Sequence, residues 1–289
     1  MVMTLNGILV PLITPFDTDG TVALGALERL AHRVLDEGAA GLVALGTTGE
    51  PGSLTAAEQE AVVEVTAAVS RERGTTLLVG ARPDLVARPE VTAALVTVPA
   101  FVRPGEAGVI AHFETVAATM PVVIYHVPYR TGQQLSAQTL LRLAAIPGVI
   151  GMKYSAGAID ETTAALVAGM PDGFALLGGD DAVLSPLLAI GAHGGIAASA
   201  NVDARSFVDL HTAWRDGDIE RARTLGNRLT ALSRSLFAEP NPTVIKGTLH
   251  DQEHIPTTSV RLPLLPAAPA SIRHALDRLT LSGSARGTR

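Results

Sequence analysis

Eight short apolar runs recur along this chain, and most are followed by a polar or glycine-rich turn and then by a segment with helical periodicity. The runs cover residues 7–13, 41–45, 75–79, 93–98, 122–125, 149–153, 174–177 and 194–198. Most of them are apolar at successive positions, which is typical of parallel strands covered on both faces. Eight such strands alternating with helices predict an α/β fold in which the strands close into a (β/α)8 barrel, the TIM barrel.

The connection between the third and fourth runs is too short for an ordinary crossover. With the third strand ending near Gly80, only residues 81–92 lie between the two strands, and Pro83 and Pro89 interrupt this stretch. A parallel crossover with its helix needs at least about 10 to 12 residues, and proline ends or kinks a helix. We therefore expect the third barrel helix to be shortened or missing.

The length of 289 residues would allow two domains, but barrels of this kind often reach such a length as one unit. We assign residues 1–203 to the barrel. Residues 204–280 show helical patterns without strands, which predicts a helical C-terminal extension. For residues 281–289 we expect a disordered tail.

The chain is 47% hydrophobic and 17% charged, which suits a sizeable core and excludes a disordered or fibrous class. Its net charge of -6 provides no basic surface for a phosphate backbone, so we expect no nucleic-acid partner. The absence of cysteine excludes disulfides and thiolate chemistry. No basic segment precedes an apolar one at the N-terminus, and no apolar run approaches the ~20 residues of a membrane span. We expect a cytoplasmic protein that does not associate with membranes.

Lysine is nearly absent from this chain: of its 22 basic residues, only Lys153 and Lys246 are lysines. Arginine provides surface charge equally well, so a lysine that ends the apolar run 149–153 suggests an amine with a chemical role. A desolvated, neutral amine can attack a ketone and form a Schiff base. The ordinary alternative is a lysine that reaches past the strand end into solvent. Lys153 is the candidate nucleophile, and Lys246, on a late helical segment, is the weaker candidate.

All three tyrosines lie close to Lys153 in the sequence, namely Tyr125, Tyr129 and Tyr154. The active sites of such barrels lie at the C-terminal ends of the strands, and Tyr125 ends the fifth run. Its hydroxyl could shuttle protons there, and Arg130 in the next loop offers a planar fork suited to a carboxylate. The alternatives are a packing role for Tyr125 and a solvated loop charge for Arg130. His126 alternates to the opposite face and is interpreted as structural.

The second run is followed by Gly46-Thr47-Thr48-Gly49-Glu50. Its two glycines permit a tight turn that can aim backbone N–H groups at an anion, and the threonine hydroxyls add donors. The alternative is an ordinary strand-to-helix turn. Further along, Thr55 and Glu58 have the spacing of a capping box, which predicts a helix N-terminus.

The main chemical alternative to a lysine imine is catalysis by a bound metal ion. Asp180 and Asp181 follow the seventh run, but the histidines are scattered without the spacing of metal ligands. We interpret the aspartate pair as a helix N-terminal cap, which requires no ion. We expect no metal site.

Several motifs, taken together and in this order, resemble the dihydrodipicolinate synthase and N-acetylneuraminate lyase family from residue 7 to about residue 265. The motifs are Gly46-Thr47-Thr48-Gly49-Glu50, Tyr125-His126-Val127-Pro128, Gly151-Met152-Lys153, Gly178-Gly179-Asp180-Asp181 and Asn241-Pro242. The resemblance implies a (β/α)8 barrel with a helical C-terminal extension, usually a homotetramer. It also implies an enzyme that condenses or cleaves pyruvate adducts without a metal or organic cofactor.

By this resemblance Lys153 forms the imine with pyruvate, Tyr125 shuttles protons, and the Thr47–Thr48 turn binds the pyruvate carboxylate. The predicted catalytic residues are Lys153, Tyr125 and Thr48. The predicted substrate-binding residues are Thr47, Arg130, Gly46 and Ile196.

The resemblance also implies a second substrate, which we expect to be a small aldehyde or 2-keto acid. Arg130 matches the arginine that the synthase branch uses for the carboxylate of aspartate semialdehyde, which favours 4-hydroxy-tetrahydrodipicolinate synthase activity. However, Tyr129 stands where that branch usually has a small residue, and Phe101 replaces a tyrosine of its proton relay across a dimer interface. These departures keep two alternatives open: an aldolase for 2-keto-3-deoxy sugar acids or 4-hydroxy-2-oxo acids, and a non-catalytic pyruvate-binding barrel. We expect a homo-oligomer, either a tetramer or a dimer.

Overall fold

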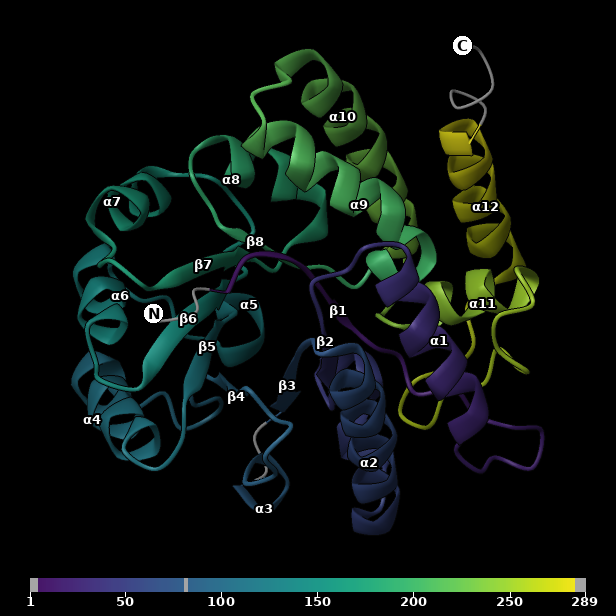
Figure 1. Cartoon of the computed structure of the whole chain (residues 1–289), viewed down its shortest axis with the longest axis horizontal. Coiled ribbons are helices and arrows are strands. Elements are labelled where there is room, and N and C mark those ends of the chain that lie inside the picture. Colours follow the sequence, from purple (N-terminus) through teal and green to yellow (C-terminus); the bar gives the residue numbers. More distant parts are fainter. Residues whose placement is uncertain (1–4, 81–82, 284–289) are drawn as a thin grey trace.

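The computed structural model describes residues 5–80 and 83–283, and within them eight parallel strands close into a barrel in sequence order, as predicted (Figure 1). The ring is complete because β1 pairs with both β2 and β8. Every strand end lies within two residues of the predicted one. The strands are β1 Gly7–Pro11, β2 Gly41–Ala44, β3 Thr76–Gly80, β4 Ala93–Thr97, β5 Val122–His126, β6 Val149–Tyr154, β7 Ala175–Gly178 and β8 Gly194–Ile196.

Helices surround the barrel and follow most strands directly (Figure 1). The longer ones bury one apolar stripe each, as α1 does with Leu27, Leu30 and Val34. The predicted capping box is present, since Thr55 and Glu58 bond reciprocally at the start of α2. The helices are α1 Leu24–Asp36, α2 Ala56–Arg73, α3 Pro83–Val86, α4 Gly105–Ala117, α5 Pro128–Thr131, α6 Ala137–Ala144, α7 Glu161–Gly169, α8 Leu184–Ala189, α9 Ala200–Arg215, α10 Ile219–Leu236, α11 Thr243–Asp251 and α12 Pro269–Gly283, with 3-10 turns η1 Thr47–Gly49, η2 Pro51–Ser53 and η3 Asp181–Val183.

The third crossover is reduced to a single turn. Helix α3 has only four residues, whereas α2 and α10 each have 18. The prediction of a shortened third helix is therefore confirmed. Residues 81 and 82 of this connection lie outside the described residues.

Side chains on the strands alternate between two apolar cores. The interior core contains Leu9, Val43 and Leu177, and the larger core between barrel and helices contains Ile124 and Met152. Because successive residues of a strand face opposite sides, the neighbours of outward residues face the barrel axis. Because of this alternation, the last inward-facing residues of β5 and β6, Tyr125 and Lys153, lie at the barrel mouth.

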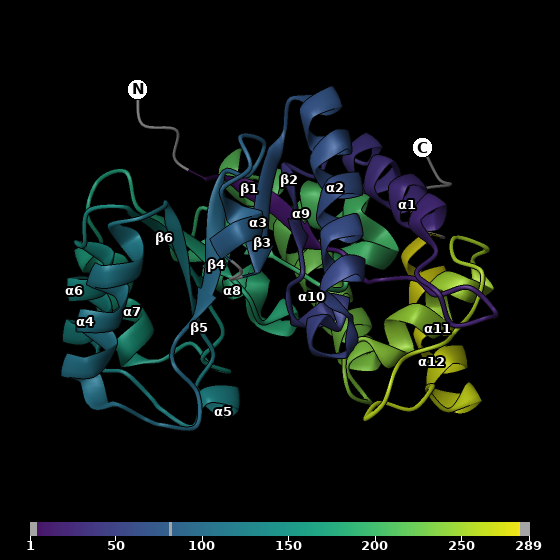
Figure 2. The ribbon, with the colours of Figure 1, turned by 90° about the horizontal axis from the view of Figure 1, so that it is seen from below.

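Helices α10 to α12 form the C-terminal extension, which packs beside α9 and reaches around toward α1 (Figures 1 and 2). The predicted boundary between residues 203 and 204 falls inside α9, next to a kink where Asp203 leaves helical geometry. Helix α12 continues through Gly283, so residues 281–283 of the predicted tail are helical, and residues 284–289 lie outside the described residues. No helix in the described ranges has the length and apolar character needed to traverse a lipid bilayer.

His126 lies in the outer layer on β5, opposite to the interior face, as its sequence position predicts. The side chain is fully buried beside the ring of Tyr154, with 5.7 Å between ring centroids. Neither ring nitrogen has a hydrogen-bond partner among the described residues. Burial lowers the pKa of His126 from 6.5 to about 4.

This burial predicts a loss of stability in mild acid. The unfolded chain binds a proton at His126 below pH 6.5 and the folded chain only near pH 4, so stability is fully present above pH 6.5 and falls as pH decreases. At about 1.4 kcal/mol per pKa unit, this group should remove roughly 2 kcal/mol of unfolding free energy between pH 7 and pH 5. Urea unfolding of wild type and His126→Phe at both pH values measures it. An equal pH dependence in the two proteins would show that another group is responsible.

Candidate active site

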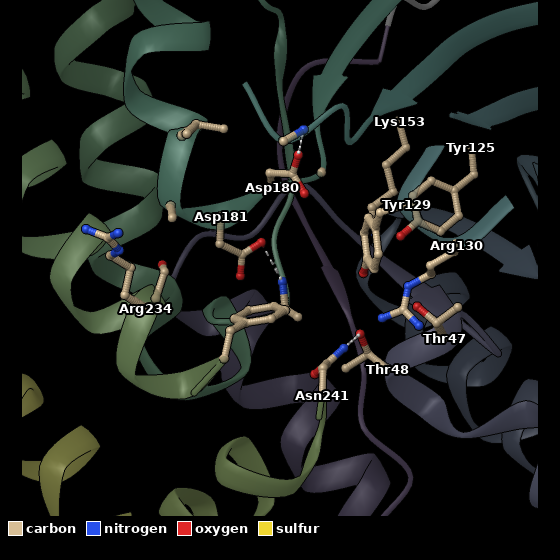
Figure 3. Close-up of a pocket in the computed structure, with 17 residues that line it drawn as sticks. Thr47, Thr48, Tyr125, Tyr129, Arg130, Lys153, Asp180, Asp181, Arg234 and Asn241 are labelled. Atoms are coloured by element: carbon tan, nitrogen blue, oxygen red, sulfur yellow. Dashed lines mark hydrogen bonds between the residues drawn. The ribbon is translucent and has the colours of Figure 1, made fainter. Parts of the chain in front are cut away.

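A cavity of about 570 Å³ opens at the C-terminal end of the barrel strands (Figure 3). Five of the residues predicted from the sequence line it together, namely Thr47, Thr48, Tyr125, Arg130 and Lys153. They come from three separate segments, namely the turn after β2, the end of β5 with the short helix α5 that follows it, and the end of β6. The closure of the barrel is what brings them to one place.

Lys153 faces the barrel interior because its neighbours Met152 and Tyr154 pack in the outer core. Its side chain is only 6% exposed, and Nζ lies 4.4 Å from the centroid of the Tyr125 ring. Tyr125 and Lys153 are register partners on adjacent strands. The amine is therefore held inside the barrel mouth and does not extend past the strand into solvent.

Gly179 makes room for this lysine. A Cβ built on Gly179 would lie 2.7 Å from Lys153 Cε and 2.2 Å from Ser155 Oγ, so any side chain here would collide with both. Ser155 is buried, and its hydroxyl has no hydrogen-bond partner among the described residues. The hydroxyl is a donor that the sequence did not single out.

Strand β5 supplies the next wall of the cavity. Tyr125 belongs to the interior core, and Pro128 starts the short helix α5, which carries Tyr129 and Arg130. The Arg130 guanidinium stacks on the Tyr129 ring, with 5.0 Å from Cζ to the centroid. Tyr154 does not join them: its hydroxyl contacts Thr163 in the outer layer, 3.2 Å away. Only two of the three clustered tyrosines reach the cavity.

The Thr47–Thr48 turn forms a third wall. It is one turn of 3-10 helix, and Glu50 at its end has a left-handed backbone with φ of 54°. Thr47 is exposed toward the opening, whereas Thr48 is buried and accepts a 2.9 Å hydrogen bond from Asn241 Nδ2 (Figure 3). Because Thr48 Oγ1 accepts this bond, its own hydrogen is free to point elsewhere.

The interpretation of Asp180 and Asp181 as a helix cap is wrong. Asp180 makes no capping hydrogen bond and instead accepts from Gly157 N at 2.7 Å. Asp181 accepts from the backbone N–H groups of Ala198 and Ser199, at 3.3 and 2.6 Å. Both line the cavity, where burial raises the pKa of each carboxyl group. The sequence identified their position after strand seven but not that they face the same cavity as Lys153.

Helix α10 closes the far side with Ser233 and Arg234, together with Phe237 just past its last residue. In Figure 3, Arg234 lies on the opposite side of the cavity from Arg130, with Asp181 between them. None of these three residues was predicted, and neither was a role for Asn241 in the following loop. The hydrophobic periodicity of a helix does not show which of its residues will face a cavity when the helix packs across the barrel mouth.

Gly46 and Ile196 are the remaining predicted substrate contacts, and a contact of either residue with substrate stays a prediction. Neither is among the residues that line the cavity. Ile196 is fully buried on β8 in the interior core that also contains Tyr125, so it supports the cavity from below. Gly46 precedes η1, where its carbonyl accepts the Gly49 N–H and shapes the turn.

The cavity combines an enclosed primary amine, a phenol beside it, hydroxyl donors and a guanidinium. Such a set can form an imine with a keto acid, move protons at the imine and hold carboxylates. Within residues 5–80 and 83–283, no three or more His, Asp or Glu side chains are grouped to hold a metal ion.

Comparisons with known proteins agree with this geometry. The sequence pattern of the dihydrodipicolinate synthetase family matches residues 4–81 and 84–279, so its break falls in the shortened third crossover. The chain is 35% identical over 286 residues to the 4-hydroxy-tetrahydrodipicolinate synthase of Neisseria meningitidis serogroup B, covering 94% of this chain and 98% of the relative.

Solved structures of related enzymes also match this chain over nearly its whole length. A chloride-inhibited dihydrodipicolinate synthase from Acinetobacter baumannii, complexed with pyruvate, superposes with a TM-score of 0.90 at 31% identity, covering 97% and 99% of the two chains. A monomeric dihydrodipicolinate synthase variant gives a TM-score of 0.90 at 28% identity, covering 96% of this chain and 97% of that chain. With the fold, the cavity and these matches in agreement, the chain belongs to the dihydrodipicolinate synthetase family.

Proposed function

We propose that this chain is a 4-hydroxy-tetrahydrodipicolinate synthase, which condenses pyruvate with aspartate semialdehyde through an imine on Lys153. The observation that carries the proposal is the placement of Lys153, buried at the barrel mouth and 4.4 Å from the ring of Tyr125. Relatives with this name span nearly the whole chain. A related enzyme has been solved with pyruvate.

Each side chain has a separate role in the proposed reaction. The Lys153 amine attacks the keto carbon of pyruvate, and loss of water leaves an iminium ion. This cation withdraws electrons, so C3 of pyruvate can lose a proton and become a nucleophilic enamine. Tyr125 carries protons to and from the imine region, and Thr47 and Thr48 donate to the pyruvate carboxylate. The iminium is the electron sink, so the mechanism assigns no role to a metal or organic cofactor.

Arg130 is assigned to the carboxylate of the second substrate. Its guanidinium is presented at the opening by α5 and stacked on Tyr129, which leaves the planar fork available for two parallel hydrogen bonds. Lysine would keep the charge but lose the fork. Arg130 is therefore the residue that distinguishes an acidic aldehyde from a neutral one.

Replacing Arg130 tests this assignment. We expect Arg130→Ala to raise the KM for aspartate semialdehyde about 10- to 100-fold, since a charge-assisted hydrogen bond contributes about 1.5–3 kcal/mol. Arg130→Lys should fall between wild type and alanine, and the KM for pyruvate should change little in both. Initial rates with each substrate varied in turn measure these values. A selective rise in the pyruvate KM would reassign Arg130 to the pyruvate carboxylate.

Phe101, in the loop after β4, affects both the expected proton relay and the expected assembly of the chain into an oligomer. Phe101 is 96% exposed with φ of 65°, and Val102 beside it is also exposed. We propose that this apolar pair is covered by a second copy of the chain in a homo-oligomer. Phe101 cannot donate a proton, so the relay across the interface must end on Tyr125 and water. Light scattering that gives the 29.9 kDa of one chain would contradict the assembly. The expected cytoplasmic location stays a prediction.

One assay separates the candidate activities. Purified enzyme is given pyruvate and aspartate semialdehyde, and consumption of both is followed. In parallel, release of pyruvate is measured from 2-keto-3-deoxy sugar acids and 4-hydroxy-2-oxo acids. Condensation supports the proposed synthase, whereas release from the panel without condensation makes the chain an aldolase. Pyruvate trapping on Lys153 with neither reaction would leave a binding barrel.

A further inference from the structure

The second lysine of the chain is buried in an ion pair. Lys246 on α11 is 0% exposed, and its Nζ donates to Glu50 Oε1 at 2.6 Å and to the Ser259 carbonyl at 2.8 Å. The same atom lies 4.0 Å from the centroid of the Phe16 ring. Every side of the ammonium group is occupied. Its compact charge suits this enclosed site better than the fork of arginine, which the chain uses elsewhere.

The partner, Glu50, ends the Thr47–Thr48 turn. Its left-handed backbone reverses the chain there, and its second carboxylate oxygen accepts from Arg261 N at 3.0 Å. Both oxygens of Glu50 are thus held by the C-terminal extension, one by α11 and one by the segment after it. This pair fixes the end of the turn to elements about 200 residues away in the sequence.

The extension reaches the same turn at a second point. Asn241, in the loop between α10 and α11, donates to Thr48 Oγ1, while Thr14 Oγ1 donates to the Gly49 carbonyl at 2.8 Å. The turn is therefore held by side-chain contacts at Thr48, Gly49 and Glu50, and two of these three positions depend on the extension. A three-residue 3-10 turn has little hydrogen bonding of its own to define its position.

We propose that the Lys246–Glu50 pair is a positioning device, through which the C-terminal extension holds the Thr47 and Thr48 hydroxyls at the place of the pyruvate carboxylate. This inference rests on the proposed function, because it assigns the turn to pyruvate. Neither Lys246 nor Glu50 touches substrate. They act through the threonines, so their loss weakens pyruvate binding and leaves the reacting amine in place.

The pair can be removed without leaving a buried charge. The double variant Lys246→Met/Glu50→Gln replaces both ions by neutral groups of similar length, which is tolerated far better than removal of one partner. Glu50→Asp keeps both charges and shortens the link. The matched control is Glu58→Gln, which removes the ion pair between Glu58 on α2 and Arg261 of the extension but leaves Glu50 and Lys246 paired.

The readout is the pyruvate concentration that gives half-maximal trapping on Lys153 by borohydride. We expect it to rise about tenfold or more in the double variant and in Glu50→Asp, and less than about twofold in Glu58→Gln. The KM for the aldehyde should stay near wild type. A folded double variant that traps pyruvate at the wild-type concentration would overturn the proposal, as would an equal rise in Glu58→Gln.

The wild-type enzyme distinguishes failure of the proposed function from failure of the proposed positioning role. If wild-type enzyme forms no adduct on Lys153, the proposed function fails first. If wild type forms the adduct and the variants form it with unchanged dependence on pyruvate, only the positioning role fails. Circular dichroism melting of each variant accompanies the titration, so that a merely structural role appears as a lower Tm with unchanged trapping.

Discussion

Lys153→Met should abolish catalysis, with kcat lower by on the order of 10⁴-fold or more, since the variant has no amine with which to form the imine. Stability should not fall, because an apolar side chain replaces a lysine that is only 6% exposed. The measurement is the initial rate of condensation together with thermal melting. An active Lys153→Met enzyme would refute imine catalysis at this position.

Mass spectrometry can show which residue carries the imine with pyruvate. Reduction with borohydride in the presence of pyruvate should add one 1-carboxyethyl group, the reduced imine of pyruvate, to wild type and none to Lys153→Met. The chain contains only one other lysine, Lys246, which is fully buried and ion-paired. An adduct on any peptide other than the one with Lys153 is therefore easy to recognise and would contradict the assignment.

Tyr125→Phe should lower kcat by about 10²- to 10³-fold, because it deletes one hydroxyl used for proton transfer and keeps the ring. The ring packs in the interior core and over Lys153, so folding and imine formation should persist. Pyruvate should still be trapped on Lys153, at a lower rate. The experiment combines steady-state kinetics with time-resolved trapping.

Tyr154→Phe is the matched control for this change. It removes the same atom one residue from Lys153, but that hydroxyl contacts Thr163 in the outer layer and not the cavity. We expect kcat within about twofold of wild type and a small loss of stability, of about 1 kcal/mol for one hydrogen bond. Equal effects in the two variants would mean that the loss in Tyr125→Phe comes from packing and not from proton transfer.

The sequence predicted the barrel well because the signal for it is local. Each strand is a short apolar run covered on both faces, and each run was visible by itself. The short third crossover was equally visible, because twelve residues with two prolines cannot hold a full helix. Lys153, Tyr125 and the Thr47–Thr48 turn could be predicted because strand ends in a barrel converge on one face.

The rest of the site depends on contacts between distant segments. Ser233, Arg234 and Phe237 line the cavity only because α10 packs over the barrel mouth, which periodicity does not specify. Asp181, the first residue of η3, is of a residue type that often caps helices, yet the approach of residues 198 and 199 gives it other partners. Ile196 stands at a strand end like Lys153, but it is fully buried in the interior core and does not reach the cavity lining.

The links between Glu50, Lys246 and Arg261 have a consequence for synthesis on the ribosome. A nascent chain that has emerged as far as β8 already contains the amine, the phenol and the threonines, but not the residues that fix their turn. On the positioning role proposed above, full affinity for substrate waits until translation has passed residue 261. Premature stop codons shortly before that point should yield barrels that consume little of the cell's keto acids.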